Sequence, residues 1–380
     1  MRKSAAPVVL VLLLVCLWTA APAEKVITLT FAGDCTLGTE ERTRRNSDSF
    51  DTVAKEKGYT YFFANFQDLF ATDDCTVVNC EGVLSDSAAS ENKSKPFRFR
   101  GEADFAKIFA EGSVELVSLA NNHIKDYGNQ GITNTKKALE DAGVEWAYGE
   151  DIRIIEKDGI RIGFASIDYG IWANACQKVK EKLLKLREKG EINAAVLLIH
   201  QGKEYAAVHR PEQDTYAEYY INRANADLVV MHHSHVAQGI RILNNRTILY
   251  SLGNFVFGGS GEVTRGANGT NSLYTMAVQV KMHFTDEGVY KGQQVTLYPA
   301  YDSGTDPVNN YQPIRVTAEE AAPVLAAIQA DTEWELPPAW TDENGKAYVQ
   351  LDYLPASPEE EPAGNGEPEP AAAHPDRSNR

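Results

Sequence analysis

Three histidines, His232, His233 and His235, fall within four consecutive positions of the sequence. They follow the apolar run Asp227–Met231, which is typical of a short buried strand. If the segment stays extended, side chains two positions apart share a side, so His233 and His235 can reach one metal ion while His232 points away. The competing interpretation is that these are loop histidines that are solvated or bond to backbone carbonyls.

Oxygen- and nitrogen-bearing side chains also follow most of the other runs that the sequence predicts as strands. In α/β folds ligands bind at the carboxyl ends of the strands, so these side chains are expected to meet. The candidates are Asp34, Asn79, Glu81, Asn121, Asn122, His123, Asp126, His200, Glu204, Tyr205 and Asn254. Several have plain structural alternatives: a helix cap for Asp34, a turn for Asn121 and Asn122, and a core histidine for His200.

Carboxylates, imidazoles and amide oxygens together are ligands of divalent ions such as manganese, iron or zinc. No cysteine pair is placed for a closed structural zinc site, and mixed oxygen and nitrogen ligation suits a catalytic centre open to water and substrate. Two ions about 3.5–4 Å apart would activate water and hold the oxygens of an in-line displacement. The sequence therefore predicts a hydrolytic centre with one or two divalent ions.

The elements that must position these side chains alternate between strands and helices. Apolar runs predict strands over 26–32, 76–78, 116–120, 160–167, 194–199, 227–231 and 247–250. Helical patterns cover 104–109, 131–142, 177–189, 213–224 and 317–330, with one more at the end of 58–70. This alternation indicates an α/β domain with a largely parallel or mixed sheet. Longer alternating strands over 272–284 and 289–298 would add antiparallel structure as a second sheet.

Two terminal segments fall outside that domain. Residues 1–23 combine a basic start, an apolar run too short for a bilayer span and a small-residue pattern, as in an export signal cleaved after Ala23. The competing interpretation is an uncleaved membrane anchor. Residues 355–380 are rich in Pro, Glu and Ala without periodicity and predict a disordered acidic tail. Residues 24–354 are thus expected to form one domain of an exported, extracytoplasmic protein.

The net charge of −16 argues against nucleic acid as a partner. It leaves anionic substrates open, because a metal site inverts the local field. Outside the cytoplasm, the four cysteines beyond the signal can form disulfides. Cys35 and Cys80 both follow predicted strands, so they are the first pair to test.

Basic and apolar residues alternate over 95–100, where Arg98 and Arg100 stand two positions apart. In a strand these two arginines would share one face and could bind a carboxylate or phosphate. A solvated edge strand is the competing interpretation. Glu204, Tyr205 and Asn254 are further candidates for positioning a substrate.

Six motifs in order resemble those of the CapA family of poly-γ-glutamate capsule synthesis proteins: GDCTLG, NCEG, SLANNHIKDYG, IHQGKEY, ADLVVMHHSHVAQG and YSLGNFVFG. They run from about Phe31 to Phe257. The family is similar to the calcineurin-like metallophosphoesterases. The resemblance therefore implies a single-domain β-sandwich flanked by helices, in four α-β-β-α layers.

The resemblance implies metal ligands at Asp34, Glu81, Asn122, His200, His233 and His235. It also implies a proton donor to the leaving group at His123, oriented by Asp126, with Asn79, Asn121 and His232 beside the ligands. The chain departs from the family pattern at Gln201, Met231 and Ser234, and Thr36 stands where the phosphoesterase motif has a histidine. That last change weakens one metal position, so one or two bound ions are expected.

For function, the resemblance implies an exported metalloprotein that takes part in synthesis, export or attachment of an anionic capsule polymer. Its chemistry would be hydrolysis of a phosphoester or an amide, or transfer onto a wall acceptor. Expected partners are the polymer or a phosphoester substrate, and membrane-bound capsule synthase subunits. Two alternatives stay open: a non-catalytic, metal-stabilised polymer-binding subunit, and an envelope phosphodiesterase or nucleotidase.

Overall fold

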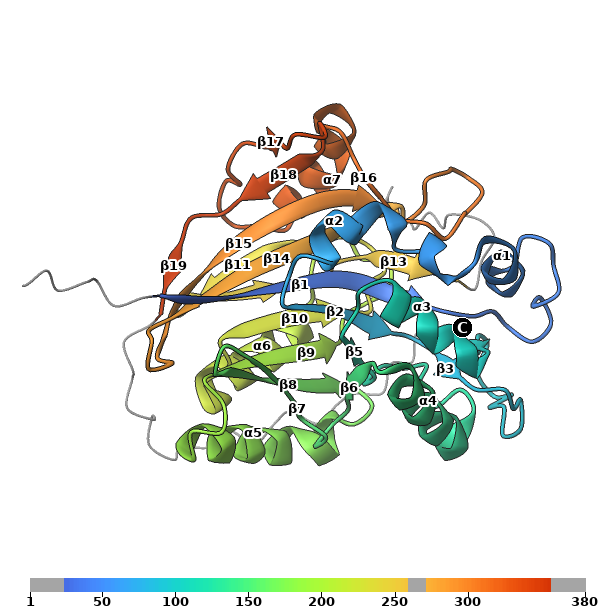
Figure 1. The fold of residues 1–380 in the computed structure, drawn as a ribbon, viewed down its shortest axis with the longest axis horizontal. Coiled ribbons are helices and arrows are strands. Elements are labelled where there is room, and N and C mark those ends of the chain that lie inside the picture. Colours follow the sequence, from blue (N-terminus) through green and yellow to red (C-terminus); the bar gives the residue numbers. More distant parts are fainter. Residues whose placement is uncertain (1–23, 259–270, 357–380) are drawn as a thin grey trace, which may run out of the picture.

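The structure is a computed structural model that describes residues 24–258 and 271–356 (Figure 1). The predicted export signal lies outside these residues, as does the predicted tail from residue 357 onward. The first residue of that tail is part of a short strand, β19 (Leu354–Pro355), which pairs with β15 (Tyr290–Tyr301). Among the described residues, no helix is both long and apolar enough to cross a membrane.

The larger of the two main sheets is built on β1 (Lys25–Thr36). One neighbour, β2 (Cys75–Cys80), is parallel to it, and the other, β14 (Tyr274–Phe284), is antiparallel. The strand order is β17 (Trp340–Thr341), β18 (Ala347–Gln350), β15, β14, β1, β2, β5 (Leu116–Ser118) and β6 (Glu145–Ala147). At its sides, β13 (Asn254–Phe257) pairs with β1, and β16 (Ile314–Arg315) with β15.

The smaller main sheet has six strands. Their order is β11 (Ile240–Leu243), β12 (Arg246–Leu249), β10 (Leu228–His232), β9 (Ala194–His200), β8 (Ile160–Asp168) and β7 (Arg153–Lys157). The expectation that the late antiparallel strands form the second sheet is wrong. β14 pairs with β1 from Lys25 to Phe31, so these strands extend the first sheet instead.

The two sheets pack face to face, and helices cover both outer faces. Between the sheets, Phe31, Leu198 and Val280 belong to one buried cluster. The remaining elements are α1 (Phe50–Lys57), α2 (Gln67–Phe70), α3 (Ala106–Glu111), α4 (Gly128–Ala142), α5 (Trp172–Glu188), α6 (Pro211–Ala224), α7 (Ala318–Ala330), the two-stranded ribbon of β3 (Val83–Leu84) and β4 (Arg100–Gly101), and the single turns η1 (Tyr59–Tyr61), η2 (Ala64–Phe66) and η3 (Ala103–Phe105).

α1 to α4 lie on the larger sheet and α5 and α6 on the smaller one, so the predicted four-layer α-β-β-α arrangement is confirmed (Figure 1). In β9, Val196 and Leu198 face the other sheet, whereas Leu197 and Ile199 face the helices. Because both faces of the strand are buried, its sequence is apolar throughout and shows no alternation. The first turn of α5 was not predicted, and it begins at Trp172, whose ring stacks on Tyr216 at 3.6 Å.

The four cysteines of the described chain carry free, buried thiols. Cys35 and Cys80 are register partners in β1 and β2, so the sequence pointed to two neighbouring residues. The structure nevertheless contains no disulfide between them. Cys35 directly follows Asp34 and Cys80 directly precedes Glu81, and both of these acidic residues are candidate metal ligands.

Candidate functional site

The candidate site lies where strands of both sheets end, and its side chains are almost all buried. Asp34 is within β1, Glu81 directly follows β2, and Asn122 lies in the turn after β5. From the smaller sheet, His200 ends β9, and the histidine-rich segment follows β10. Convergence of strand ends, which the sequence predicted, is confirmed for these residues.

The histidine-rich segment is not extended, which corrects the expected directions of its side chains. His233 and His235 have φ angles of +96° and +56°, so the chain turns sharply after β10. His232 remains in β10, and its Nδ1 lies 3.2 Å from Asp34 Oδ1. His235 Nδ1 lies 3.4 Å from Asp34 Oδ2, and the His233 backbone N–H donates to the same oxygen at 3.3 Å. His232 therefore contacts Asp34 and does not point away from the site.

Candidate ligand atoms of carboxylates and imidazoles gather in three overlapping groups in the described chain, each with its atoms within 4.8 Å of one another. The groups are Asp34, Glu81 and His235; Glu81, His200 and His233; and Glu204, His233 and His235. Glu81 belongs to the first two, so its carboxylate lies between two candidate ion positions. The carboxylate of Glu204, which the sequence suggested for substrate positioning, lies within 4.8 Å of ring nitrogens of His233 and His235, so it could share an ion with them.

The surroundings of one buried oxygen of Glu81 show whether these residues fit a cation. Glu81 Oε1 has no hydrogen-bond partner and lies 3.7 Å from both His200 Nε2 and His235 Nε2. An unsatisfied buried carboxylate oxygen is costly, and a cation between the oxygen and the two imidazoles would satisfy it. His200 Nε2 also lies 3.0 Å from Asn122 Oδ1, which adds an amide oxygen to the same place. These residues therefore fit a divalent cation.

The site concentrates buried charge. Burial alone would raise the pKa of Asp34, but hydrogen bonds and charge from His232 and His235 hold that pKa well below its usual range. Burial raises the pKa of Glu81 well above its usual range, with the Asp34 charge adding and His235 opposing. Burial also lowers the pKa of His200 well below its usual range, so this imidazole is neutral and able to bind a metal ion.

Two asparagines hold the ligand candidates in place, as expected. Asn79 Nδ2 donates to Asp34 Oδ1 at 2.7 Å and to Glu81 Oε2 at 3.3 Å, and lies 3.3 Å from His200 Nδ1. Asn121 Nδ2 donates to Asn79 Oδ1 at 3.2 Å and to the Cys80 carbonyl at 2.8 Å. These amides fix the orientation of the carboxylates across the β1–β2 pair.

His123 and Asp126 form a hydrogen-bonded pair beside the cluster. His123 Nδ1 lies 2.7 Å from Asp126 Oδ2, and the same oxygen accepts the Phe99 backbone N–H at 2.8 Å. Sequence reasoning missed two neighbours of this pair. Lys95 Nζ donates to Asp126 Oδ1 and, at 2.7 Å, to the Asn122 carbonyl, and the Phe99 ring lies 4.6 Å from the His123 ring. Burial lowers the pKa of His123, with Asp126 opposing this shift.

Asn254 contacts the cluster from the other side of β1. It is the register partner of Asp34, and its Oδ1 lies 2.9 Å from His235 Nδ1. Behind it, Asp302 is buried and hydrogen-bonded to Asn254, and burial raises the pKa of Asp302 well above its usual range. Asp302 belongs to the turn after β15, and no motif in the sequence marks it. Tyr205 packs near the cluster, with its ring centre 6.0 Å from that of His235.

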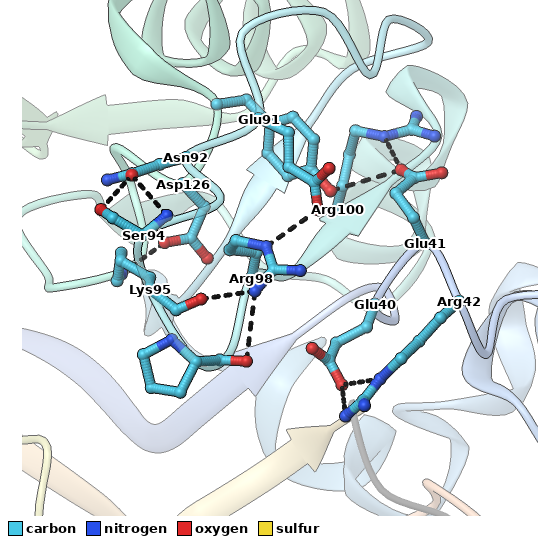
Figure 2. A network of polar contacts seen from close by, with 12 residues as sticks. Glu40, Glu41, Arg42, Glu91, Asn92, Ser94, Lys95, Arg98, Arg100 and Asp126 are labelled. Carbon is cyan, nitrogen blue, oxygen red and sulfur yellow. Dashed lines mark hydrogen bonds and ion pairs between the residues drawn. The ribbon is translucent and has the colours of Figure 1, made fainter. Parts of the chain in front are cut away.

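Arg98 and Arg100 do not form the shared strand face that was expected. Only Arg100 lies in a strand, the two-residue β4, so there is no continuous strand to place both side chains together. Arg98 Nε donates to Glu91 Oε1 at 2.8 Å, and Arg100 Nε donates to Glu41 Oε1 at 2.5 Å (Figure 2). Each arginine is therefore paired with a carboxylate of the protein.

The sequence matches a described family and several curated proteins. Residues 28–259 match the family described as bacterial capsule synthesis protein PGA_cap. Capsule biosynthesis protein CapA of Bacillus anthracis is 25% identical over 284 residues, which cover 66% of this chain and 67% of that protein. PGA biosynthesis protein CapA of Bacillus subtilis is 22% identical over 376 residues, covering 92% and 91%. A probable polyglutamine synthesis accessory protein of Mycobacterium tuberculosis is 26% identical over 295 residues, covering 70% of each chain.

Among solved structures, the calcineurin-like phosphoesterase YfkN of Bacillus subtilis gives a TM-score of 0.44 at 11% identity, covering 76% of this chain and 95% of that one. A hypothetical protein of Thermus thermophilus gives 0.39 at 15% identity, covering 72% and 99%. The family match covers more than half of the chain and includes the strand ends from Asp34 to His235. The chain therefore belongs to the bacterial capsule synthesis protein family PGA_cap.

Proposed function

We propose that the protein is an exported, metal-dependent hydrolase or transferase that acts in the assembly of a polyglutamate-type capsule polymer. Its family and the names of its relatives support this pathway. The word "accessory" in the name of the mycobacterial relative supports membrane-bound synthase subunits as partners. The signal pattern of residues 1–23 supports export.

The observation that carries the proposal is the buried Glu81 carboxylate shared between two groups of ligand candidates. Its Oε1 has no hydrogen-bond partner and is equally distant, at 3.7 Å, from His200 Nε2 and His235 Nε2. A purely structural carboxylate would be expected to accept hydrogen bonds at both oxygens. Manganese, iron and zinc all accept this mixture of carboxylate, imidazole and amide ligands.

A divalent ion at this place supplies Lewis acidity, which makes water a nucleophile at neutral pH. Asp34, Glu81 and the three ligand histidines would hold one or two such ions, with Asn122 and Glu204 at the more exposed edge of the cluster. His123 has its Nδ1 occupied by Asp126, which leaves Nε2 to give a proton to the leaving group. Its lowered pKa makes the protonated ring a stronger proton donor.

The assay uses purified protein with Mn²⁺ on aryl phosphate monoesters and diesters and on γ-linked oligoglutamate. His123→Ala should lower turnover by about 100-fold or more while leaving the bound metal unchanged. Metal content is measured in parallel by elemental analysis. Stoichiometric metal without turnover of any substrate would refute the hydrolase and support the metal-stabilised binding subunit.

Export is tested separately by cell fractionation and N-terminal sequencing. The protein should be recovered outside the cytoplasm with Glu24 as its first residue. Recovery in the membrane fraction with residues 1–23 intact would favour the anchor, and recovery in the cytoplasm would refute export.

A further inference from the structure

A large charged cavity is lined by the loop that follows β1, by α1 and by segments of the β3–β4 ribbon. Its volume is about 650 Å³, within the range of about 300–1,000 Å³ that ligand clefts occupy. Five basic side chains line it: Arg42, Arg44, Arg45, Lys55 and Arg100. Four acidic side chains line it as well, so in a chain with a net charge of −16 the cavity carries a small local excess of positive charge.

Two of the five basic side chains are mostly buried and held by ion pairs, and the other three are exposed to solvent. The Arg44 and Arg100 side chains are 11% and 8% exposed, and both pair with Glu41. Arg42 and Lys55 are 71% and 59% exposed. The cavity therefore has a rigid guanidinium base and a rim of cations that can move towards a ligand.

The acidic side chains of the cavity are already engaged by the protein. Glu41 accepts from Arg100, Asp51 is paired with Arg44, and Glu102 accepts from Lys55 at 2.6 Å. The Asp86 carboxylate accepts the Ala103 backbone N–H at 3.0 Å. The charges of Glu41 and Asp51 are thus compensated by Arg100 and Arg44. The exposed rim cations Lys55 and Arg42 form ion pairs with Glu102 and Glu40, which are weak enough for an incoming anion to exchange.

The cavity is joined to the metal site through consecutive residues. Phe99 contacts the His123 ring, and the next residue, Arg100, lines the cavity. The β3–β4 ribbon that carries Arg100 begins two residues after Glu81. Phe99 and Arg100 thus connect the His123 pair and one wall of the cavity along the chain.

We propose that this cavity binds a short stretch of a polycarboxylate chain, of the γ-linked polyglutamate type. Repeated carboxylates match several guanidinium and ammonium groups, and arginine binds carboxylates in a bidentate manner. The choice of polymer rests on the proposed function, whereas the anion site rests on the cavity itself. The volume admits a few residues of such a chain and leaves the rest outside.

Binding is measured by fluorescence anisotropy of a labelled, γ-linked oligoglutamate titrated with the purified protein, once in EDTA and once with Mn²⁺. The rim variant Arg42→Glu, Arg45→Glu, Lys55→Glu should weaken binding by about tenfold or more, because three exposed charge contacts are reversed. Arg45→Gln alone, a milder change, should weaken it by about threefold. Circular dichroism checks that both variants fold.

The matched control reverses three exposed lysines, on α4, on α5 and directly after α5: Lys137→Glu, Lys178→Glu and Lys189→Glu. Each is at least half exposed and paired with an acid, as Arg42 and Lys55 are, and the net charge changes equally. Its affinity should change by less than about twofold. Equal losses of affinity for the oligoglutamate in the rim and control variants would show that the cavity is not the binding site.

Binding measured in EDTA and in Mn²⁺ distinguishes a failure of this proposal from a failure of the proposed function. Rim-dependent binding in EDTA supports the cavity even if the protein hydrolyses nothing. Absence of binding in both media would overturn the cavity proposal and leave hydrolysis to be judged by its own assay. Inorganic polyphosphate is the competing anion, and rim-dependent binding of polyphosphate as tight as that of oligoglutamate would overturn the assignment to a carboxylate polymer.

Discussion

Glu81→Gln should change the stability of this protein in opposite directions with and without metal. Without metal, Glu81 is fully buried, its pKa is raised by burial, and its Oε1 lacks a hydrogen-bond partner. Leaving such a group unsatisfied costs about 1–3 kcal/mol. Glutamine has the same shape and no charge, and its oxygen can keep the hydrogen bond from Asn79 Nδ2. In EDTA the variant should therefore be more stable than the wild type by about 1–3 kcal/mol.

Metal should reverse this order. A ligand at 100 to 1,000 times its Kd stabilises the folded state by about 2.7–4.1 kcal/mol. Glu81 belongs to two of the three groups of ligand candidates, so the variant should lose most of that gain. With Mn²⁺ in excess, the wild type should then exceed the variant by about 1–2 kcal/mol.

Urea unfolding followed by circular dichroism, in EDTA and in Mn²⁺, measures both differences. The control is Asp73→Asn, which also removes a partly buried carboxylate, but before the start of β2, at the opposite end from Glu81. That variant should respond to Mn²⁺ as the wild type does. An unchanged metal response in Glu81→Gln would refute its role as a ligand, and a loss of stability in EDTA would refute the argument from the unsatisfied oxygen.

Three further outcomes follow from the same structure. Burial raises the pKa of Asp73 from 3.8 to about 7, so this group lowers the stability of the folded state progressively between about pH 4 and pH 7, and by a constant amount above pH 7. Asp73→Asn should raise the free energy of unfolding by about 1–2 kcal/mol at pH 8, a gain that fades as the pH falls towards 4, and pH-independent stabilisation would contradict this. Glu204→Gln should weaken Mn²⁺ binding by about tenfold in calorimetric titration, since its carboxylate lies with His233 and His235, and an unchanged Kd would exclude it as a ligand. Burial raises the pKa of all four described thiols. Iodoacetamide should therefore label none of them in the native protein and all four after unfolding, and mass spectrometry counts the labels. Rapid labelling of Cys35 in the native protein would contradict its burial.

Local sequence patterns were enough to predict the strands and the residue types at their ends. A strand buried on both faces, such as β9, is apolar throughout, and a polar side chain directly after it, such as His200, marks the place where the strand reaches the edge of the sheet. Because five strand ends carry metal-ligand residue types, the general position of the candidate site could be predicted before the structure.

Only the tertiary structure decided which strands share a sheet and how the site side chains point. Pairing of β14 with β1 brings together segments about 250 positions apart, and no local pattern specifies such a partner. The positive φ angles at His233 and His235 turn the chain after β10, so His232 contacts Asp34 although spacing alone placed it on the opposite side.

The same holds for residues that long-range packing brings to the site. Lys95 reaches Asp126 and the Asn122 carbonyl from a loop of the β3–β4 ribbon, and Asp302 reaches Asn254 from the turn after β15. Hydrophobic periodicity encodes which face of an element is buried, and it carries no information on which distant loop lies against that face. The sequence by itself therefore determined the kinds of ligand at the strand ends, and the packing of two sheets determined the geometry of the cluster around Glu81.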